Sequence, residues 1–262
     1  MRIGIEWNGE FNGTVAEQAE YIKKYGFDTT FIGLGGVDID EVMAELGRVG
    51  VVCENCHAPY NRINELWKSG EAGDSVVEEL CGYVDDCARH GIKTMVVHLS
   101  SGMKPPRMSD VGFDRIHKLM EHAESKGVTI AYENIRRLDN VAYALENYPK
   151  AGLCWDVGHE ACYTGDKQFM LIFGSRIAAL HLHDNNAVYD DDSHQFPYDG
   201  KIDMDRAAGH LARSGYEGSI MLEVRMQNVG ITDPHEFYSK AKAAAVRFAE
   251  TVEKYKSEQI GI

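Results

Sequence analysis

Short apolar runs alternate with amphipathic segments along nearly the whole chain. Between the runs, apolar positions recur at helical spacing, as Val15, Ala19 and Ile22 do near the start. The runs predict eight strands, at 2–7, 29–33, 51–57, 93–99, 128–133, 152–156, 177–183 and 219–224. The segments between them predict helices at 14–25, 40–49, 74–90, 110–126, 139–148, 167–173, 203–214 and 234–255, with a polar loop at 58–70.

The order of these elements predicts an α/β fold. Thr14 is an expected N-cap, and several predicted helices stop at a glycine, as at Gly50 and Gly127. Apolar strands alternating with helices indicate a parallel sheet, and eight such units without a break in composition predict a single (β/α)₈ TIM-barrel domain over residues 1–262. A doubly wound open sheet is the alternative, but the 33–36 segment is too loose for a dinucleotide-binding turn.

The net charge of the chain limits the kinds of partner that it is expected to bind. The chain has 27 Lys and Arg against 41 Asp and Glu, a formal net charge of −14, which disfavours nucleic acids and anionic membranes. No stretch approaches the length of a membrane span, and the start lacks the apolar segment of a signal peptide. Together with six cysteines, which we expect to be reduced thiols, these features predict a cytoplasmic protein.

Ionisable residues recur at one end of the predicted strands. The ends of parallel barrel strands meet at one mouth, where barrel enzymes keep their active sites. An ionisable side chain among apolar residues is costly there unless it is paired or metal-bound. From the third strand to the eighth, the residues concerned are His57, His98, Glu133, Asp156 with His159 shortly after it, His181 and Glu223. Their shared position predicts a metal site.

Each of these residues alone has a simpler interpretation. A histidine at a strand end can be a hydrogen-bonded rim residue, Asp156 can cap the next segment, and the run 190–192 can be a solvated surface. As a set, two glutamates, an aspartate and a histidine form a hard site for Mn²⁺, Mg²⁺ or Co²⁺, with Zn²⁺ tolerated. Such an ion stabilises an enediolate, and two carboxylates can then move a proton off and back onto the adjacent carbon.

These motifs resemble those of the xylose isomerase-like barrel superfamily, the sugar phosphate isomerase/epimerase group related to ketose 3-epimerases and endonuclease IV. The resemblance covers nearly the whole chain. Its carriers are His57-Ala58-Pro59-Tyr60, Val97-His98, Tyr132-Glu133-Asn134, Trp155-Asp156-Val157-Gly158-His159, His181-Leu182-His183-Asp184-Asn185, the loop from Asp192-Ser193-His194 to Gly200-Lys201-Ile202-Asp203, and Leu222-Glu223.

The resemblance implies a metal-dependent sugar isomerase or epimerase. By analogy with ketose 3-epimerases, which the chain resembles, Glu133, Asp156, His181 and Glu223 would bind one divalent ion. Glu133 and Glu223 would also be the catalytic acid/base pair. His159 would contact the substrate, His183 would support the ligands, and by its position Arg225 can also reach the substrate. The substrate would be a small sugar or sugar phosphate, with no organic cofactor and a homodimer or tetramer as the expected assembly.

Three alternatives remain open. The same enediolate can expel a leaving group, which would make the chain a lyase or dehydratase on a keto-sugar or keto-acid. Endonuclease IV cuts at abasic sites with three zinc ions, and counterparts of all its ligand types are present: His57, His98 and Glu133; Glu133, Asp156, His181 and Glu223; His159, Asp192 and His194. A non-catalytic binding barrel is the third. The 33–36 and 104–107 segments could cradle a phosphate, although plain turns are the commoner role.

Overall fold

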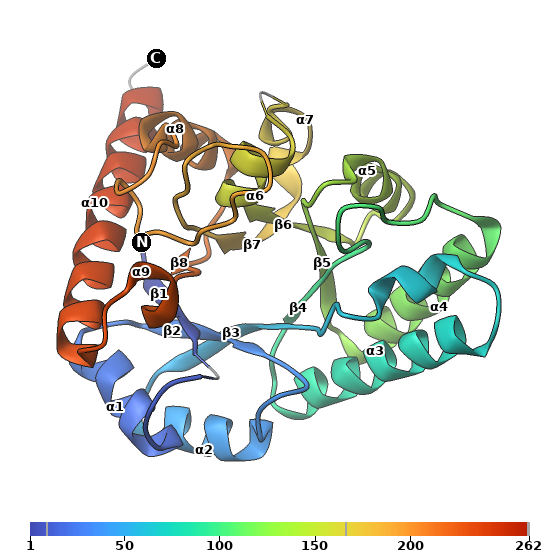
Figure 1. The fold of residues 1–262 in the computed structure, drawn as a ribbon, viewed down its shortest axis with the longest axis horizontal. Coiled ribbons are helices and arrows are strands. Elements are labelled where there is room, and N and C mark those ends of the chain that lie inside the picture. Colours follow the sequence, from blue (N-terminus) through green and yellow to red (C-terminus); the bar gives the residue numbers. More distant parts are fainter. Residues whose placement is uncertain (9, 166, 261–262) are drawn as a thin grey trace.

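The predicted barrel is confirmed. The computed structural model describes residues 1–8, 10–165 and 167–260, and in it eight parallel strands form one sheet in the order β7-β6-β5-β4-β3-β2-β1-β8 (Figure 1). A parallel bridge between Leu182 and Leu222 joins the two outer strands. The strands are β1 (Ile3–Trp7), β2 (Thr29–Gly33), β3 (Val52–His57), β4 (Thr94–Val97), β5 (Thr129–Glu133), β6 (Gly152–Asp156), β7 (Ile177–His181) and β8 (Ile220–Leu222).

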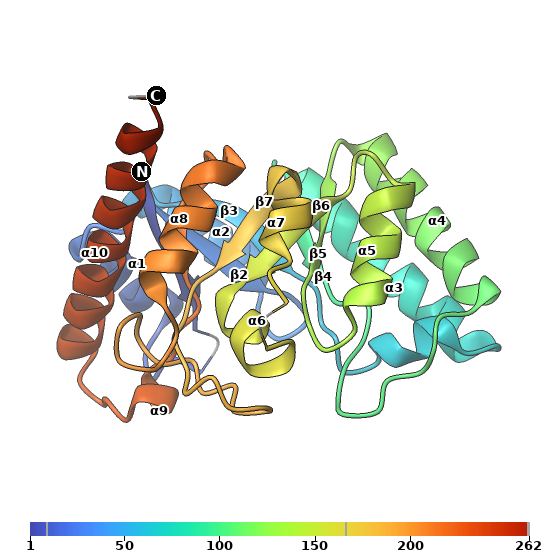
Figure 2. The same ribbon diagram turned by 90° about the horizontal axis from the view of Figure 1, so that it is seen from above.

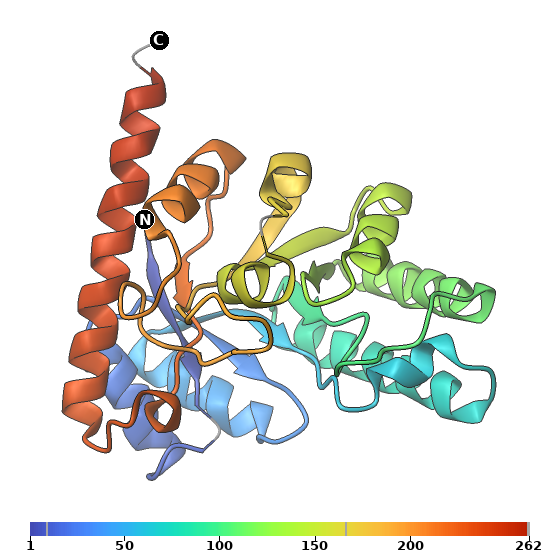
Figure 3. The same cartoon turned by 45° about the horizontal axis from the view of Figure 1, so that its top comes forward.

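Helices surround the strands. Figure 3 shows the longest of them, α10, running beside β1 and α8. The helices are α1 (Val15–Lys24), α2 (Ile39–Val49), α3 (Glu71–Arg89), α4 (Asp110–Lys126), α5 (Leu138–Asn147), α6 (Val157–Tyr163), α7 (Met170–Phe173), α8 (Met204–Ser214), α9 (Met226–Val229) and α10 (Pro234–Ile260), with short 3₁₀ helices η1 (Ile63–Trp67) and η2 (Gly174–Arg176). Within the described ranges, no helix is long and apolar enough to cross a bilayer.

Local signals explain where the elements begin and end. Thr14 and Glu17 form a capping box, in which each side chain accepts a hydrogen bond from the backbone N–H of the other residue. Gly50 ends α2 with φ of 70°, a left-handed conformation that favours glycine. Strand residues such as Ile5 and Leu153 are fully buried in the apolar core.

Some predicted boundaries are wrong. The seventh strand ends at His181 rather than 183, because its pairing with β6 ends there, and Asp184 instead pairs with Gln195 in an antiparallel bridge. The third helix begins at Glu71, and the predicted loop at 58–70 contains η1. Helices α6 and α9 were not predicted, since they have seven and four residues and little room for a periodic pattern.

The strand order brings the ionisable strand ends together. In Figure 2, α6, α9 and the long loop after β7 lie at one end of the barrel, opposite the chain's N-terminus. The register places Asp156 of β6 level with His181 of β7. Side chains from neighbouring strands therefore meet at the mouth.

Candidate metal centre

The first group of potential metal ligands joins β3, β4 and β5. Glu133 is 1% exposed, and its Oε2 lies 3.0 Å from Nε2 of both His57 and His98. The two histidine Nε2 atoms lie 3.2 Å apart. Tyr60 covers this group by stacking on His98, with 4.3 Å between the ring centroids.

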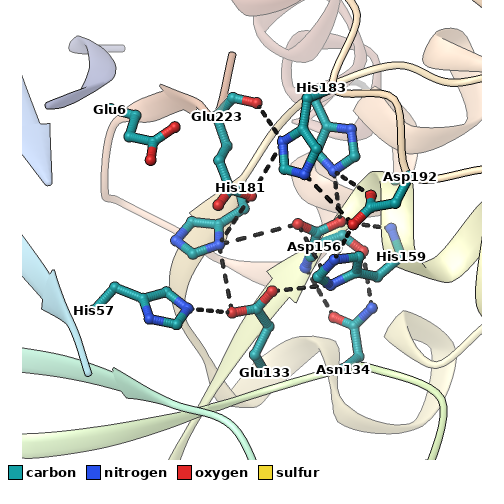
Figure 4. Close-up of polar contacts among 12 residues, drawn as sticks. Glu6, His57, Glu133, Asn134, Asp156, His159, His181, His183, Asp192 and Glu223 are labelled. Atoms are coloured by element: carbon teal, nitrogen blue, oxygen red, sulfur yellow. Dashed lines mark hydrogen bonds and ion pairs between the residues drawn. The ribbon is translucent and has the colours of Figure 1, made fainter. Parts of the chain in front are cut away.

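The second group shares Glu133 with the first. Glu133, Asp156, His181 and Glu223 each offer a ligand atom within 4.8 Å of the others, and all four are buried. Nδ1 of His181 lies 3.4 Å from Oε2 of Glu223 and 3.6 Å from Oε2 of Glu133. Figure 4 shows the two glutamates on opposite sides of His181.

The third group lies beside the second and consists of His159, His183, Asp192 and His194. Asp192 Oδ2 is 3.2 Å from Nε2 of His159 and 3.5 Å from Nε2 of His194. The sequence interpretation gave His183 a supporting role. In the structure its ring is fully buried, stacks on His194 and lies 3.2 Å from Oδ1 of Asp156, so it is a candidate ligand that links the second and third groups.

Unpartnered buried atoms show that these groups fit cations. Within the described part of the chain, buried polar atoms without a hydrogen-bond partner gather at this mouth: His98 Nδ1, Asp156 Oδ2, His159 Nδ1, both ring nitrogens of His181, His183 Nε2, Asp192 Oδ1 and Glu223 Oε2. Leaving such atoms unsatisfied is costly. Ligand atoms at most 4.8 Å apart suit an ion bound at about 2.0–2.4 Å. The carboxylate-rich second group suits a hard ion, and the histidine-rich third group suits zinc.

The two glutamates have opposite electrostatic environments. Burial acts to raise the pKa of Glu133, but His98 and His181 outweigh it and lower the pKa well below its ordinary range. Burial raises the pKa of Glu223, with His181 and His194 only partly opposing it. Burial lowers the pKa of His98 to about 4. Neutral imidazole and carboxylate are the forms that coordinate metals, so an ion at Glu223 would have to displace the proton that its raised pKa favours.

Backbone contacts hold the ligands in place. Asn134 and Asp156 bond reciprocally: Nδ2 of Asn134 donates to the carbonyl of Asp156 at 2.8 Å, and the Asp156 N–H donates to Oδ1 of Asn134 at 2.8 Å. Asp156 also caps α6 by accepting from the N–H of His159 at 2.6 Å. The side chain of Asn185 donates to the carbonyl of Gly158 at 2.9 Å, which ties α6 to the loop after β7.

Replacing Gly158 with alanine is expected to disrupt the third group. A Cβ at this position would lie 1.9 Å from Cε1 of His183, and that ring is confined between Gly158 and His194. We expect the free energy of unfolding to fall by about 1–3 kcal/mol and the affinity for Zn²⁺ to weaken, as measured by denaturant unfolding and metal titration. Gly47→Ala in α2 is the control, since nothing lies within 4 Å of its added Cβ. Equal stability and zinc affinity of both variants would contradict the expectation.

A cavity of about 230 Å³ opens above these groups. It is smaller than the roughly 300–1,000 Å³ typical of pockets for drug-sized ligands, so it suits a small molecule. Asp156 and His181 are fully buried and do not line it, whereas the other predicted site residues do: His57, His98, Glu133, His159, Asp192, His194, Glu223 and Arg225. Glu6, Tyr60 and Arg136 also line it and were missed, although Glu6 stands near the end of an apolar strand as the predicted residues do.

Comparisons with known proteins agree with this architecture. Residues 14–247 match the family model described as the xylose isomerase-like TIM barrel. The uncharacterized protein y4fM of Sinorhizobium fredii (strain NBRC 101917 / NGR234) is 26% identical over 95% of this chain and 85% of its own length.

Solved structures with a similar fold include two epimerases. L-ribulose 3-epimerase has a TM-score of 0.77 and 17% identity, covering 100% of this chain and 98% of that one. The 3-keto-D-glucoside 4-epimerase YcjR from E. coli has a TM-score of 0.74 and 20% identity, covering 95% and 99%. The structure is thus a (β/α)₈ barrel with clustered potential metal ligands at its C-terminal mouth. The chain belongs to the xylose isomerase-like TIM-barrel family.

Proposed function

We propose that this protein is a metal-dependent isomerase or epimerase of a sugar or sugar-like keto compound. The observation that carries the proposal is the buried group of Glu133, Asp156, His181 and Glu223, whose unpartnered atoms converge beneath a small cavity. Mn²⁺, Co²⁺, Mg²⁺ or Zn²⁺ would be held by these four side chains. When bound, the ion polarises a carbonyl and orients the neighbouring hydroxyl of the substrate.

Glu133 and Glu223 are the proposed proton carriers. A carboxylate oxygen of one removes the proton from the carbon next to the carbonyl, and the substrate becomes an enediolate. The other glutamate returns a proton from the opposite side, which inverts that carbon or moves the carbonyl. His159, buried beside Glu133, would hold a substrate hydroxyl.

Solvent deuterium tests this mechanism. The protein loaded with Mn²⁺ is expected to interconvert a ketose or keto-glycoside in D₂O and to place deuterium on the reacting carbon, as followed by NMR. The deuterium arises because a carboxyl proton exchanges with solvent before it returns. Turnover without deuterium uptake would exclude proton transfer by the glutamates, and absence of turnover across a panel of such sugars with all four metals would reject the proposal.

The three ligand groups favour a second candidate, an endonuclease IV-like AP-site nuclease. They match the three-zinc set that the resemblance implies, with His183 in addition. The net charge of −14 and the pairing of both arginines that line the cavity with carboxylates favour a small-molecule substrate instead. Incision of abasic duplex DNA by the zinc-loaded protein would establish the nuclease. A new alkene or carbonyl with loss of water from a sugar would indicate a lyase.

A further inference from the structure

A salt bridge in the cavity wall belongs to none of the three ligand groups. Glu6, in β1, is 6% exposed, and Arg225 is the N-cap residue of α9, three residues after the end of β8. Nε of Arg225 lies 3.0 Å from each carboxylate oxygen of Glu6, and its Nη2 donates to Oε1 at 2.6 Å. Both residues line the cavity. The pair is therefore preorganised where a substrate would lie.

The pair is close to the proposed reacting end. Arg225 lies two residues after Glu223, and both residues line the same cavity. Figure 4 shows Glu6 on the Glu223 side of the site, away from Asp192. For a small molecule whose reacting carbons lie between Glu133 and Glu223, Glu6 and Arg225 form the part of the cavity wall on the Glu223 side.

The hydrogen bonds between Glu6 and Arg225 leave a donor on Arg225 and an acceptor on Glu6 free to bind a ligand. Among the described residues, Arg225 donates to Glu6 through Nε and Nη2, and its side chain is 44% exposed, so its Nη1 donors face solvent or ligand. The Glu6 oxygens keep unused lone pairs. A neutral pair that both donates and accepts matches a hydroxyl group, which does the same.

The remaining charge in the wall does not favour an anion. Arg136, the second arginine that lines the cavity, pairs with Asp190 and lies over the ring of Tyr163 at 3.7 Å. Across residues 1–8, 10–165 and 167–260, no lysine lines the cavity. Of the two segments considered for phosphate binding, 33–36 contributes Gly33 and Leu34 to the wall but no cation, and neither Lys104 nor Arg107 lines it. A phosphate or carboxylate group would lie against Glu6 without an unpaired cation to bind it.

We propose that Glu6 and Arg225 bind hydroxyl groups at the unreactive end of the substrate and select an unphosphorylated polyhydroxy compound over its phosphate ester. This inference rests on the proposed sugar chemistry for the reacting end.

The first experiment compares a neutral ketose with its terminal phosphate ester as substrates of the metal-loaded protein. The neutral compound is expected to have at least about a 100-fold higher kcat/KM, as when an unpaired charge is placed against a carboxylate. Equal or better turnover of the phosphate ester would overturn the inference while leaving the proposed reaction intact.

The second experiment uses Glu6→Gln, which releases the charge of Arg225 and preserves the side-chain shape. For the neutral substrate, KM should rise about tenfold with little change in kcat, because a bound hydroxyl loses an ionic acceptor. Inorganic phosphate should bind the metal-loaded variant about tenfold more tightly than the wild type, as measured by calorimetry. Phosphate binding to the metal itself is common to both proteins, so the difference reports on Glu6.

Two further variants separate recognition from net charge and stability. Glu20→Gln makes the same charge change in an exposed pair with Arg48 and should behave as the wild type. Arg225→Gln should raise KM without tighter phosphate binding, and it replaces Glu6→Gln if that variant does not fold. If Glu6→Gln folds but leaves KM and phosphate affinity unchanged, the pair is purely structural. The calorimetry needs no turnover, so it remains informative even if the proposed reaction fails.

Discussion

Replacing Glu133 with glutamine is expected to reduce kcat/KM by at least about 10³-fold, because one carboxylate would lose both of its proposed roles. Glu133 Oε2 lies 3.0 Å from His57 and from His98, and Glu133 also belongs to the group around His181. An uncharged amide cannot accept a proton from carbon and is a weaker ligand. Bound metal should fall together with activity, as measured by elemental analysis of the purified variant.

Glu160→Gln provides the matched control. Glu160 is also buried in the mouth region, on α6, but its Oε2 accepts from the indole N–H of Trp155 at 3.0 Å, and it belongs to none of the ligand groups. Activity and metal content should remain near wild type. If Glu133→Gln kept its activity and its metal while remaining folded, Glu133 would be neither a ligand nor a proton carrier.

The candidate ligands could be predicted because each one at a strand end directly follows a buried apolar residue. Met95, Val96 and Val97 are buried ahead of His98, and Leu153 to Trp155 are buried ahead of Asp156. Parallel pairing then makes the positions of the polar residues equivalent from strand to strand, as the register of Asp156 with His181 shows. The prediction needed only the direction of each strand and its last residues.

The wall of the site depends on contacts between residues far apart in the sequence, which a local sequence pattern cannot predict. Glu6 and Arg225 are 219 positions apart and meet only because β1 pairs with β8. Alternation within the strand shows that Glu6 is an acidic residue among apolar ones, but it does not show which residue faces it. The salt bridge, and with it the neutral character of the wall, therefore required the closed barrel.

The loop after β7 was predicted to carry the possible ligands Asp192 and His194, but its backbone conformation was not predicted. Its backbone is strained: among the described residues, those other than glycine with positive φ all lie here, at Ala187, Asp190, His194 and Tyr198. Each such conformation costs on the order of 1 kcal/mol and persists only where other contacts enforce it. A buried carboxylate, Asp184, makes contacts of this kind.

Asp184 is the centre of this loop. It is fully buried, and its carboxylate accepts four backbone hydrogen bonds: from Asn185 at 2.8 Å, and from Tyr198, Gly200 and Ile202 at 3.0 Å each. Residues 198–202 are thereby held against the end of β7, and the intervening segment with Asp192 and His194 is closed over the third group. A carboxylate that binds several backbone amides is strongly stabilising.

Asp184→Asn is therefore expected to lower the free energy of unfolding by about 2–4 kcal/mol, because the amide nitrogen would face backbone donors and cannot accept from them. The third group should lose affinity for Zn²⁺, while the group of Glu133, Asp156, His181 and Glu223, which lies mainly on the strands, keeps its ion. Denaturant unfolding and metal stoichiometry measure the two effects separately. Asp199→Asn makes the same change at an exposed position of the loop and should alter neither. If Asp184→Asn lost the strand-held ion first, or lost both together without being destabilised, Asp184 would act on the metal centre as a whole rather than through the loop.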